Sequence, residues 1–171
     1  MVGKDDKKHS GTEYFCGYKN QVSFNAETEF VTSVIPGRAN DYDGHKLKKL
    51  VEKDLKKGID IGTVACDKGY GYGDNRCYLK EKGVNSTVGL NNYRTQKKDG
   101  NKGGWIKLKE RHEYREGLKE RYKIEKKFGE AKEWHGFIRC RYLGSARHAI
   151  QSYLSFMALN LKKATIWHLG L

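Results

Sequence analysis

Residues 59–70 read IDIGTVACDKGY, and this stretch decides the fold. Residues 59–66 are a short, largely apolar run, which predicts a buried strand. Asp67 follows this strand at once, and a carboxylate at the carboxyl end of a buried strand points into the crevice where open α/β sheets bind ligands. The alternative is an aspartate that caps a helix or closes a turn, and position alone does not decide between the two.

The residues before this strand predict a β-hairpin and a helix. Apolar and polar residues alternate over 14–24, and residues 30–35 (FVTSVI) are the expected partner strand, ended by Pro36. Residues 47–55 carry apolar side chains at helical spacing, and Gly58 is the expected stop. The expected N-cap residues of this helix are Asn40, Asp41 and Asp43. A hairpin followed by a helix and a strand predicts an α/β or α+β domain.

The residues after Asp67 predict three further helices and one more strand. In chain order we expect a helix over 74–82 stopped by Gly83, an edge strand over 84–88, a loop over 89–104, a long helix from about 105 to 134 and an apolar helix from 145 to about 163.

Composition narrows the class of protein. The 171 residues suffice for one domain with a core, and 34 Lys and Arg against 21 Asp and Glu give a net charge of +13. Residues 94–147 hold 17 of the basic and 8 of the acidic side chains, so the excess is concentrated there. It predicts a polyanionic partner, of which nucleic acid is the commonest. No apolar run is long enough to span a membrane, and the N-terminus lacks the apolar stretch of a secretory signal.

The four cysteines (Cys16, Cys66, Cys77 and Cys140) are scattered and lack metal-ligand spacing. We expect a reducing compartment, and we expect the cysteines in apolar segments to be small buried hydrophobic residues.

Glu125 lies in the middle of the long helix, within RYKIEKKFGEAK over 121–132. Arg121 and Lys132 share its helical face. A glutamate among cations at this spacing is most often part of a surface ion pair. In the other interpretation, Glu125 binds a divalent cation while Arg121 and Lys132 hold phosphates beside it. Spacing alone leaves both open.

Six groups of residues follow one another in an order that resembles the insertion-sequence transposases of the DDE superfamily, the ribonuclease-H-like nucleases. They are GYK (17–19), PG with ND (36–37 and 40–41), CDKGY (66–70), RxxIExxFGxxK (121–132), WHG with RY (134–136 and 141–142) and LNLKK (159–163). The resemblance covers nearly the whole chain from Tyr14 onward. It implies an α/β fold with a ribonuclease-H-like mixed sheet flanked by helices.

The resemblance implies roles for individual residues. Asp67 corresponds to the second catalytic aspartate and Glu125 to the catalytic glutamate, both of them metal ligands. Arg121 and Lys132 match the basic positions of the family signature, and they are expected to bind DNA together with Lys68, Tyr70 and Lys126.

One position departs from that signature. Its tyrosine is replaced by Leu118, and Tyr122 and Tyr114 are the candidates to substitute for it in contacting DNA.

The implied reaction is metal-dependent cleavage of transposon ends, followed by strand transfer into target DNA. In the intact family three carboxylates hold two Mg²⁺ (or Mn²⁺) ions. The first catalytic aspartate lies on a strand well before the GYK strand, whereas Asp5 and Asp6 lie in a polar stretch, residues 1–13, that we expect to be a solvated tail. We therefore expect residues 14–171 to be the C-terminal part of a DDE transposase catalytic domain, with its first strand missing, a weakened metal site and no strand-transfer activity.

Two other functions stay open at this point. One is a non-catalytic basic nucleic-acid-binding protein, and the other is a metal-dependent nuclease of similar fold outside transposition. The expected partner is DNA, with a second copy of the chain or a missing N-terminal fragment as further alternatives. The expected location is the prokaryotic cytoplasm, at the nucleoid when DNA is bound.

Overall fold

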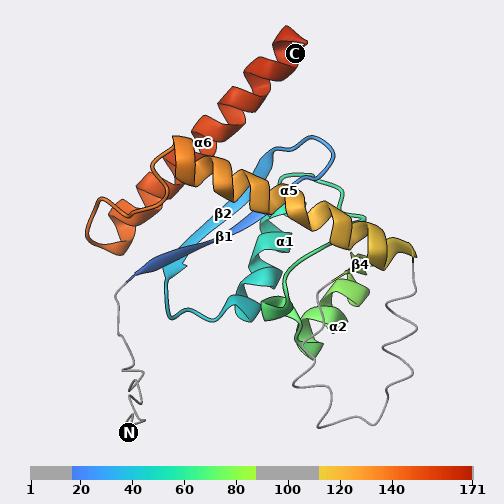
Figure 1. The fold of residues 1–171 in the computed structure, drawn as a ribbon. Helices are drawn as coiled ribbons and strands as arrows, with labels where there is room; N and C mark the ends of the chain where they lie inside the picture. Colours follow the sequence, from blue (N-terminus) through green and yellow to red (C-terminus); the bar gives the residue numbers. More distant parts are fainter. Residues whose placement is uncertain (1–16, 88–111, 171) are drawn as a thin grey trace, which may run out of the picture.

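The structure, a computed structural model, describes residues 17–87 and 112–170. The described part is a mixed α/β arrangement (Figure 1). In chain order its elements are β1 (Tyr18–Phe24), β2 (Val31–Arg38), the 3₁₀ turn η1 (Asp43–Lys46), α1 (Leu47–Lys56), β3 (Thr63–Val64), the 3₁₀ turn η2 (Lys68–Tyr70), α2 (Gly73–Glu81), β4 (Asn85–Ser86), α5 (His112–Trp134) and α6 (Ser145–Leu169). The predicted tail over 1–13 and the predicted loop over 89–104 lie outside the described residues, so both stay predictions.

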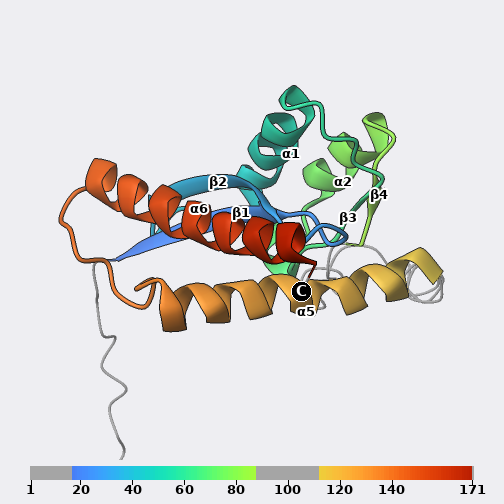
Figure 2. The same ribbon diagram turned by 90° about the horizontal axis from the view of Figure 1, so that it is seen from above.

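The hairpin is the centre of the first core. β1 and β2 pair antiparallel, from Tyr18 opposite Arg38 to Phe24 opposite Val31. α1 packs on one face of the hairpin, and α5 and α6 lie on the other (Figures 1 and 2). The buried residues of this core come from β2, α5 and α6, and they are Val31, Val34, Ala131, Phe156 and Leu159. The alternation of the hairpin sequence thus produces one face for the paired helices and one face for α1.

A second core lies between α1, α2 and the second sheet. β3 and β4 are two residues each and pair in parallel, with Thr63 opposite Asn85. The buried residues of this core are Leu47, Val51, Leu79 and Val84. Among the described strands, β1 with β2 and β3 with β4 form two separate two-stranded sheets.

Glycines end helices where the sequence predicts it. Gly58 follows α1 with φ +74°, and Gly83 follows α2 with φ +71°. Both lie in the left-handed region that glycine adopts without a steric penalty, so both predicted stops are confirmed. Gly117 of α5 has another role, because a Cβ at this position would overlap the side chain of Thr87, just after β4. The missing side chain allows α5 to approach the second sheet.

Four predicted boundaries are wrong. The edge strand predicted over 84–88 shrinks to the two residues of β4, which pair with the two residues of β3. β2 continues through Pro36 to Arg38, because no described strand pairs with its outer edge and a proline is tolerated on an edge strand. The strand predicted over 59–66 shrinks to β3, whose Thr63 is exposed, because in the described residues β3 pairs only with the two residues of β4. α6 continues past residue 163 to Leu169 and ends at Gly170, with φ +66°.

The predicted cap of α1 is also wrong. The turn η1 precedes α1, whose N-cap residue is Lys46 and makes no side-chain cap hydrogen bond. The two aspartates form ion pairs instead: Asp41 with Lys46 at 3.0 Å, and Asp43 with Lys19 of β1 at 2.6 Å.

The LNLKK sequence (159–163) fastens α6 to the rest of the protein. Leu159 is buried in the first core. The Asn160 side-chain amide accepts a hydrogen bond from Val31 N at 2.9 Å and donates one to Val31 O at 2.8 Å, as a neighbouring strand would. Lys162 pairs with Glu130 of α5, and Lys163 pairs with Glu29 in the hairpin turn, each at 2.7 Å. Four of these five residues therefore hold α6 against the rest of the protein, whereas Leu161 is exposed.

Candidate functional site

Asp67 lies three residues beyond the end of β3 and begins the turn η2. Its extended backbone makes it the N-cap residue, and its Oδ1 accepts a hydrogen bond from Lys68 N at 2.7 Å. The carboxylate remains two-thirds exposed. The turn-capping role considered from the sequence is therefore real, and it leaves the carboxylate accessible to a ligand.

Glu125 projects from α5 toward the same place. Arg121, one helical turn earlier, holds Nη2 at 3.0 Å from Glu125 Oε1. The same guanidinium holds Nη1 at 3.4 Å from Asp67 Oδ1. One cation thus contacts both predicted catalytic carboxylates, although they belong to different elements. The surface ion pair that spacing predicts for Glu125 is present, and the fold adds Asp67 to it.

These ion pairs contribute little to folding. The two carboxylates are exposed over more than half of their surface, and pairs of this kind are worth about 0–1 kcal/mol. The carboxylates are therefore free to exchange the guanidinium for another cation at small cost to stability. Carboxylate oxygens are the ligands that Mg²⁺ and Mn²⁺ prefer, so the residue types fit a divalent metal ion. The number of ligands is low: within 17–87 and 112–170 no three acidic, His or Cys side chains are grouped to hold a metal.

The segment that carries Asp67 is held by a chain of polar contacts that the sequence did not predict. The Tyr70 hydroxyl donates to Gln21 Oε1, and Gln21 Nε2 donates to Asp43 Oδ1 at 2.7 Å. Asp43 in turn pairs with Lys19. Burial, then the nearby Asp43 carboxylate, raises the pKa of the Tyr70 hydroxyl, which keeps this donor protonated. The one feature of the sequence that could have indicated these contacts is Gln21, a polar residue within the alternating pattern of β1.

Cys66 precedes Asp67 and packs against the second core. Burial, with a contribution from Asp67, raises the pKa of its thiol to about 12. This fits the predicted role of a small hydrophobic residue. Of the other cysteines, Cys77 is exposed, Cys140 is half-buried and Cys16 lies outside the described residues. Cys66, Cys77 and Cys140 are free thiols.

The predicted DNA-binding lysines differ from their neighbours in having no carboxylate partner in the described part of the chain. Lys68, Lys126 and Lys132 are all exposed. On α5, by contrast, other lysines pair within the helix: Lys119 with Glu116, Lys123 with Glu120 and Lys127 with Glu130. An unpaired exposed cation is available to a phosphate without first breaking an ion pair.

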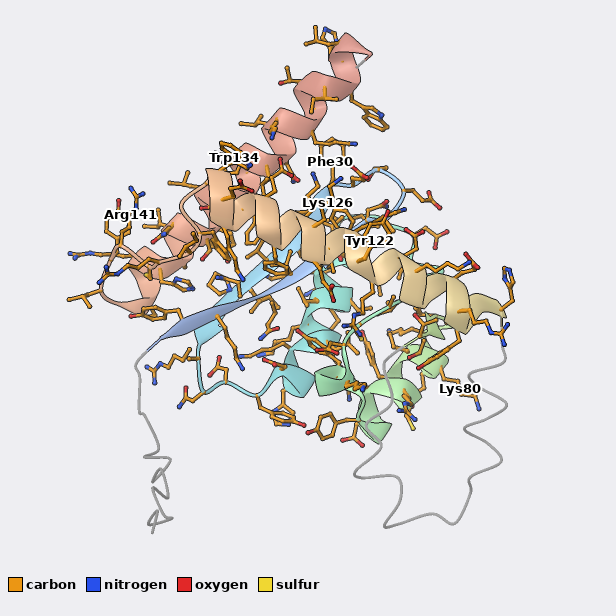
Figure 3. All side chains as sticks on the ribbon, viewed as in Figure 1. Phe30, Lys80, Tyr122, Lys126, Trp134 and Arg141 are labelled. Atoms are coloured by element: carbon orange, nitrogen blue, oxygen red, sulfur yellow. The ribbon has the colours of Figure 1, made fainter. Side chains whose placement is uncertain are left out.

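The aromatic candidates separate by burial. Tyr122 is 60% exposed and Tyr114 only 6%, so of these two only Tyr122 presents its ring to a ligand. Tyr122 and Lys126 lie one turn apart in the middle of α5 (Figure 3). Tyr70 is half-buried with its hydroxyl turned to Gln21, and a DNA contact by Tyr70 stays a prediction.

No helix in the described residues combines the length and apolar character needed to cross a bilayer. No solved structure matches the chain. The chain is 31% identical over 151 residues to a protein of Neisseria meningitidis serogroup B described as the transposase for insertion sequence element IS1106. The match covers 88% of this chain and 48% of that relative, so the chain spans about half the length of the relative. A family model described as the transposase DDE domain matches residues 2–161. With that match over most of its length, the chain belongs to the DDE-domain transposase family.

Proposed function

We propose that the chain is the part of an insertion-sequence transposase that supplies two carboxylates, Asp67 and Glu125, to a metal-dependent site for DNA cleavage and strand transfer. The observation that carries the proposal is that the guanidinium group of Arg121 contacts both carboxylates at the same time. This contact supports the proposal that the two side chains share one site and that the site accepts a positive charge.

Asp67 and Glu125 would hold the divalent ion, Mg²⁺ or Mn²⁺. When bound, such an ion polarises a phosphodiester and activates the attacking oxygen. Arg121, once displaced from the carboxylates, remains on the same face of α5 and holds a phosphate beside them. Lys68, Lys126 and Lys132 bind neighbouring phosphates and position the DNA.

Two carboxylates are fewer than the three that a two-ion site requires. We propose that the third comes from a segment outside the described residues or from a separate polypeptide, and that this chain alone does not transfer strands. We also propose that one further strand joins β1 to β3, merging the two small sheets into a ribonuclease-H-like mixed sheet. The contact between Gln21 of β1 and Tyr70 after β3 supports this, because it shows the two sheets already close together.

The assembled enzyme acts on transposon ends and target DNA, in the cytoplasm of a prokaryotic cell and at its nucleoid. A second copy of the chain or an N-terminal fragment is the proposed partner. α6 supports a partner of this kind, because it exposes Ile150, Leu154, Met157 and Leu161 by more than half along one side.

The test is the sign of the effect of metal on DNA affinity. If Asp67 and Glu125 hold an ion against a phosphate, 5 mM Mg²⁺ strengthens binding of an oligonucleotide, and the gain disappears in Asp67→Asn and Glu125→Gln. Glu116→Gln is the matched control, because Glu116 is a half-exposed, lysine-paired glutamate of the same helix. The alternative, a non-catalytic basic binding protein, predicts that Mg²⁺ only weakens binding by competing for phosphates.

A plasmid-nicking assay tests the proposed inactivity of the isolated chain. We expect no Mg²⁺- or Mn²⁺-dependent nicking above that of the Asp67→Ala/Glu125→Ala double variant. Nicking by the unmodified chain that vanishes in the double variant would show that two carboxylates suffice.

A further inference from the structure

The connection between α5 and α6 presents an unusual surface. Four large hydrophobic side chains on or beside it are more exposed than buried: Trp134 is 69% exposed, Ile138 77%, Tyr142 52% and Leu143 87%. Arg139 and Arg141 lie between them in the sequence and are also exposed. We call these six residues the junction surface. Trp134 and Arg141 mark its place at the end of α5 farthest from the second sheet (Figure 3).

The backbone of this connection is fixed, so the exposure is a property of the folded state. The Gln151 amide donates to Gly136 O at 3.3 Å and to Arg139 O at 3.1 Å, and it accepts from Arg141 N at 3.1 Å. Phe137 anchors the centre of the connection, with its ring 5.0 Å from that of Phe156 in the first core. A held loop with outward hydrophobic groups is pre-organised for binding, because little conformational entropy remains to be lost.

The charge of the region is positive without compensation. Residues 134–171 contain no Asp or Glu. In the described structure the guanidinium groups of Arg139, Arg141 and Arg147 make no ion pair, whereas Lys162 and Lys163 further along α6 are paired with Glu130 and Glu29. Three unpaired cations beside the exposed rings favour a polyanion over an uncharged protein face.

These three cations are arginines rather than lysines, and this difference indicates which class of polyanion binds. The chain has 25 Lys and 9 Arg, yet residues 134–161 contain three Arg and no Lys. A guanidinium binds phosphate through two parallel hydrogen bonds and stacks on aromatic bases, whereas an ammonium is a strongly hydrated point charge. Exposed Trp and Tyr rings stack on unpaired bases, and aliphatic side chains wedge between base steps.

We infer that the junction surface binds unpaired nucleotides of DNA, by stacking Trp134 and Tyr142 on bases while Arg139 and Arg141 hold the phosphates. The inference deepens the proposed function, on which it rests for DNA as the substrate. Trp134 lies nine residues beyond Glu125 on α5, so the two are about 14 Å apart along the helix, the length of about four nucleotides. The surface therefore contacts DNA a few nucleotides from the carboxylates, where a strand opens before or after cleavage.

The experiment compares a fluorescein-labelled 12-nucleotide single strand with the blunt duplex of the same sequence, by anisotropy in EDTA. We expect tighter binding of the single strand, and an affinity loss of about 10-fold for it in Trp134→Ala/Tyr142→Ala, with a smaller loss for the duplex. Trp167→Ala is the matched control, since Trp167 is 64% exposed near the far end of α6. This variant should bind the single strand with unchanged affinity. Arg141→Lys keeps the charge and should still weaken binding.

The result separates this inference from the proposed function. Binding in EDTA does not depend on the metal, and an amide in place of either carboxylate removes negative charge beside Arg121. Asp67→Asn and Glu125→Gln should therefore not weaken single-strand binding. If metal-dependent DNA affinity fails but the Trp134→Ala/Tyr142→Ala loss is found, the junction surface stands and the catalytic assignment falls. Equal affinity for both DNAs, unaffected by the double variant, would overturn the inference. So would binding to vesicles of 30% anionic lipid that the double variant abolishes while DNA binding is unchanged, because the surface would then serve a membrane.

Discussion

Replacement of Asn160 by alanine tests how α6 is held. The Asn160 amide satisfies both backbone groups at the outer edge of Val31, a residue only 8% exposed. Alanine leaves this N–H and this C=O without a partner, at about 1–3 kcal/mol for each buried group. For the two groups together this amounts to about 2–6 kcal/mol. Because the groove between β2 and α6 lets water approach part of this edge, we expect a loss of unfolding free energy in the lower half of that total, ~2–4 kcal/mol.

Urea unfolding followed by circular dichroism measures this free energy. In a thermal scan the same loss corresponds to a decrease in Tm of roughly 5–15 °C. Thr165→Ala is the control, because Thr165 lies on the same helix and is exposed, and among the described residues its hydroxyl bonds only to Leu161 O of its own helix. It should change stability by less than about 0.5 kcal/mol. A loss for Asn160→Ala as small as that of the control would refute the idea that this amide replaces a strand at the edge of β2.

Three further outcomes follow from the structure. Gly117→Ala should destabilise the protein by about 1–3 kcal/mol in urea unfolding, because the added Cβ overlaps the side chain of Thr87. Gly129→Ala should stabilise the protein by about 0.5–1 kcal/mol, because the space around this helical glycine is open. Lys126→Ala should weaken duplex binding and lower the salt slope by about 1 in anisotropy titrations at several salt concentrations, whereas Lys119→Ala, which removes a paired lysine, should not. With a thiol pKa of about 12, Cys66 is protonated at pH 8 and should resist iodoacetamide in the folded protein, and mass spectrometry should find it alkylated only after unfolding in urea.

Local patterns predicted the elements that depend on local physics. The two-residue period of the hairpin produces β1 and β2, and glycines end α1 and α2 where the left-handed backbone is needed. Pro36 misled the prediction of β2, because whether a proline ends a strand depends on whether a neighbour needs its N–H. The predicted length of β3 was wrong for a related reason, since the length of a strand depends on the strands that pair with it.

The candidate site was predicted in its residues but not in its contacts. Asp67 and Glu125 could be singled out from a strand end and a helical signature, but spacing paired Glu125 only with its own helix. The ion pair between Arg121 and Asp67 forms because α5 passes close to the end of β3 in the folded protein. The hydrophobic periodicity of the sequence carries no information about this tertiary contact. The polar chain through Gln21 and the double hydrogen bond of Asn160 were missed likewise, because polar side chains in regular elements give no sign of distant partners.

The most direct test of the central claim is Mn²⁺ binding to the purified chain, measured by paramagnetic relaxation of water protons. If Asp67 and Glu125 form one metal site, Mn²⁺ binds weakly, in the millimolar range, and Asp67→Asn and Glu125→Gln each abolish binding while Glu116→Gln does not. Arg121→Gln should tighten binding several-fold, because it removes the guanidinium 3.0 Å from Glu125 and 3.4 Å from Asp67 that competes with the ion. Mn²⁺ binding that none of the three substitutions at Asp67, Glu125 and Arg121 changes would contradict the claim that these two carboxylates act together.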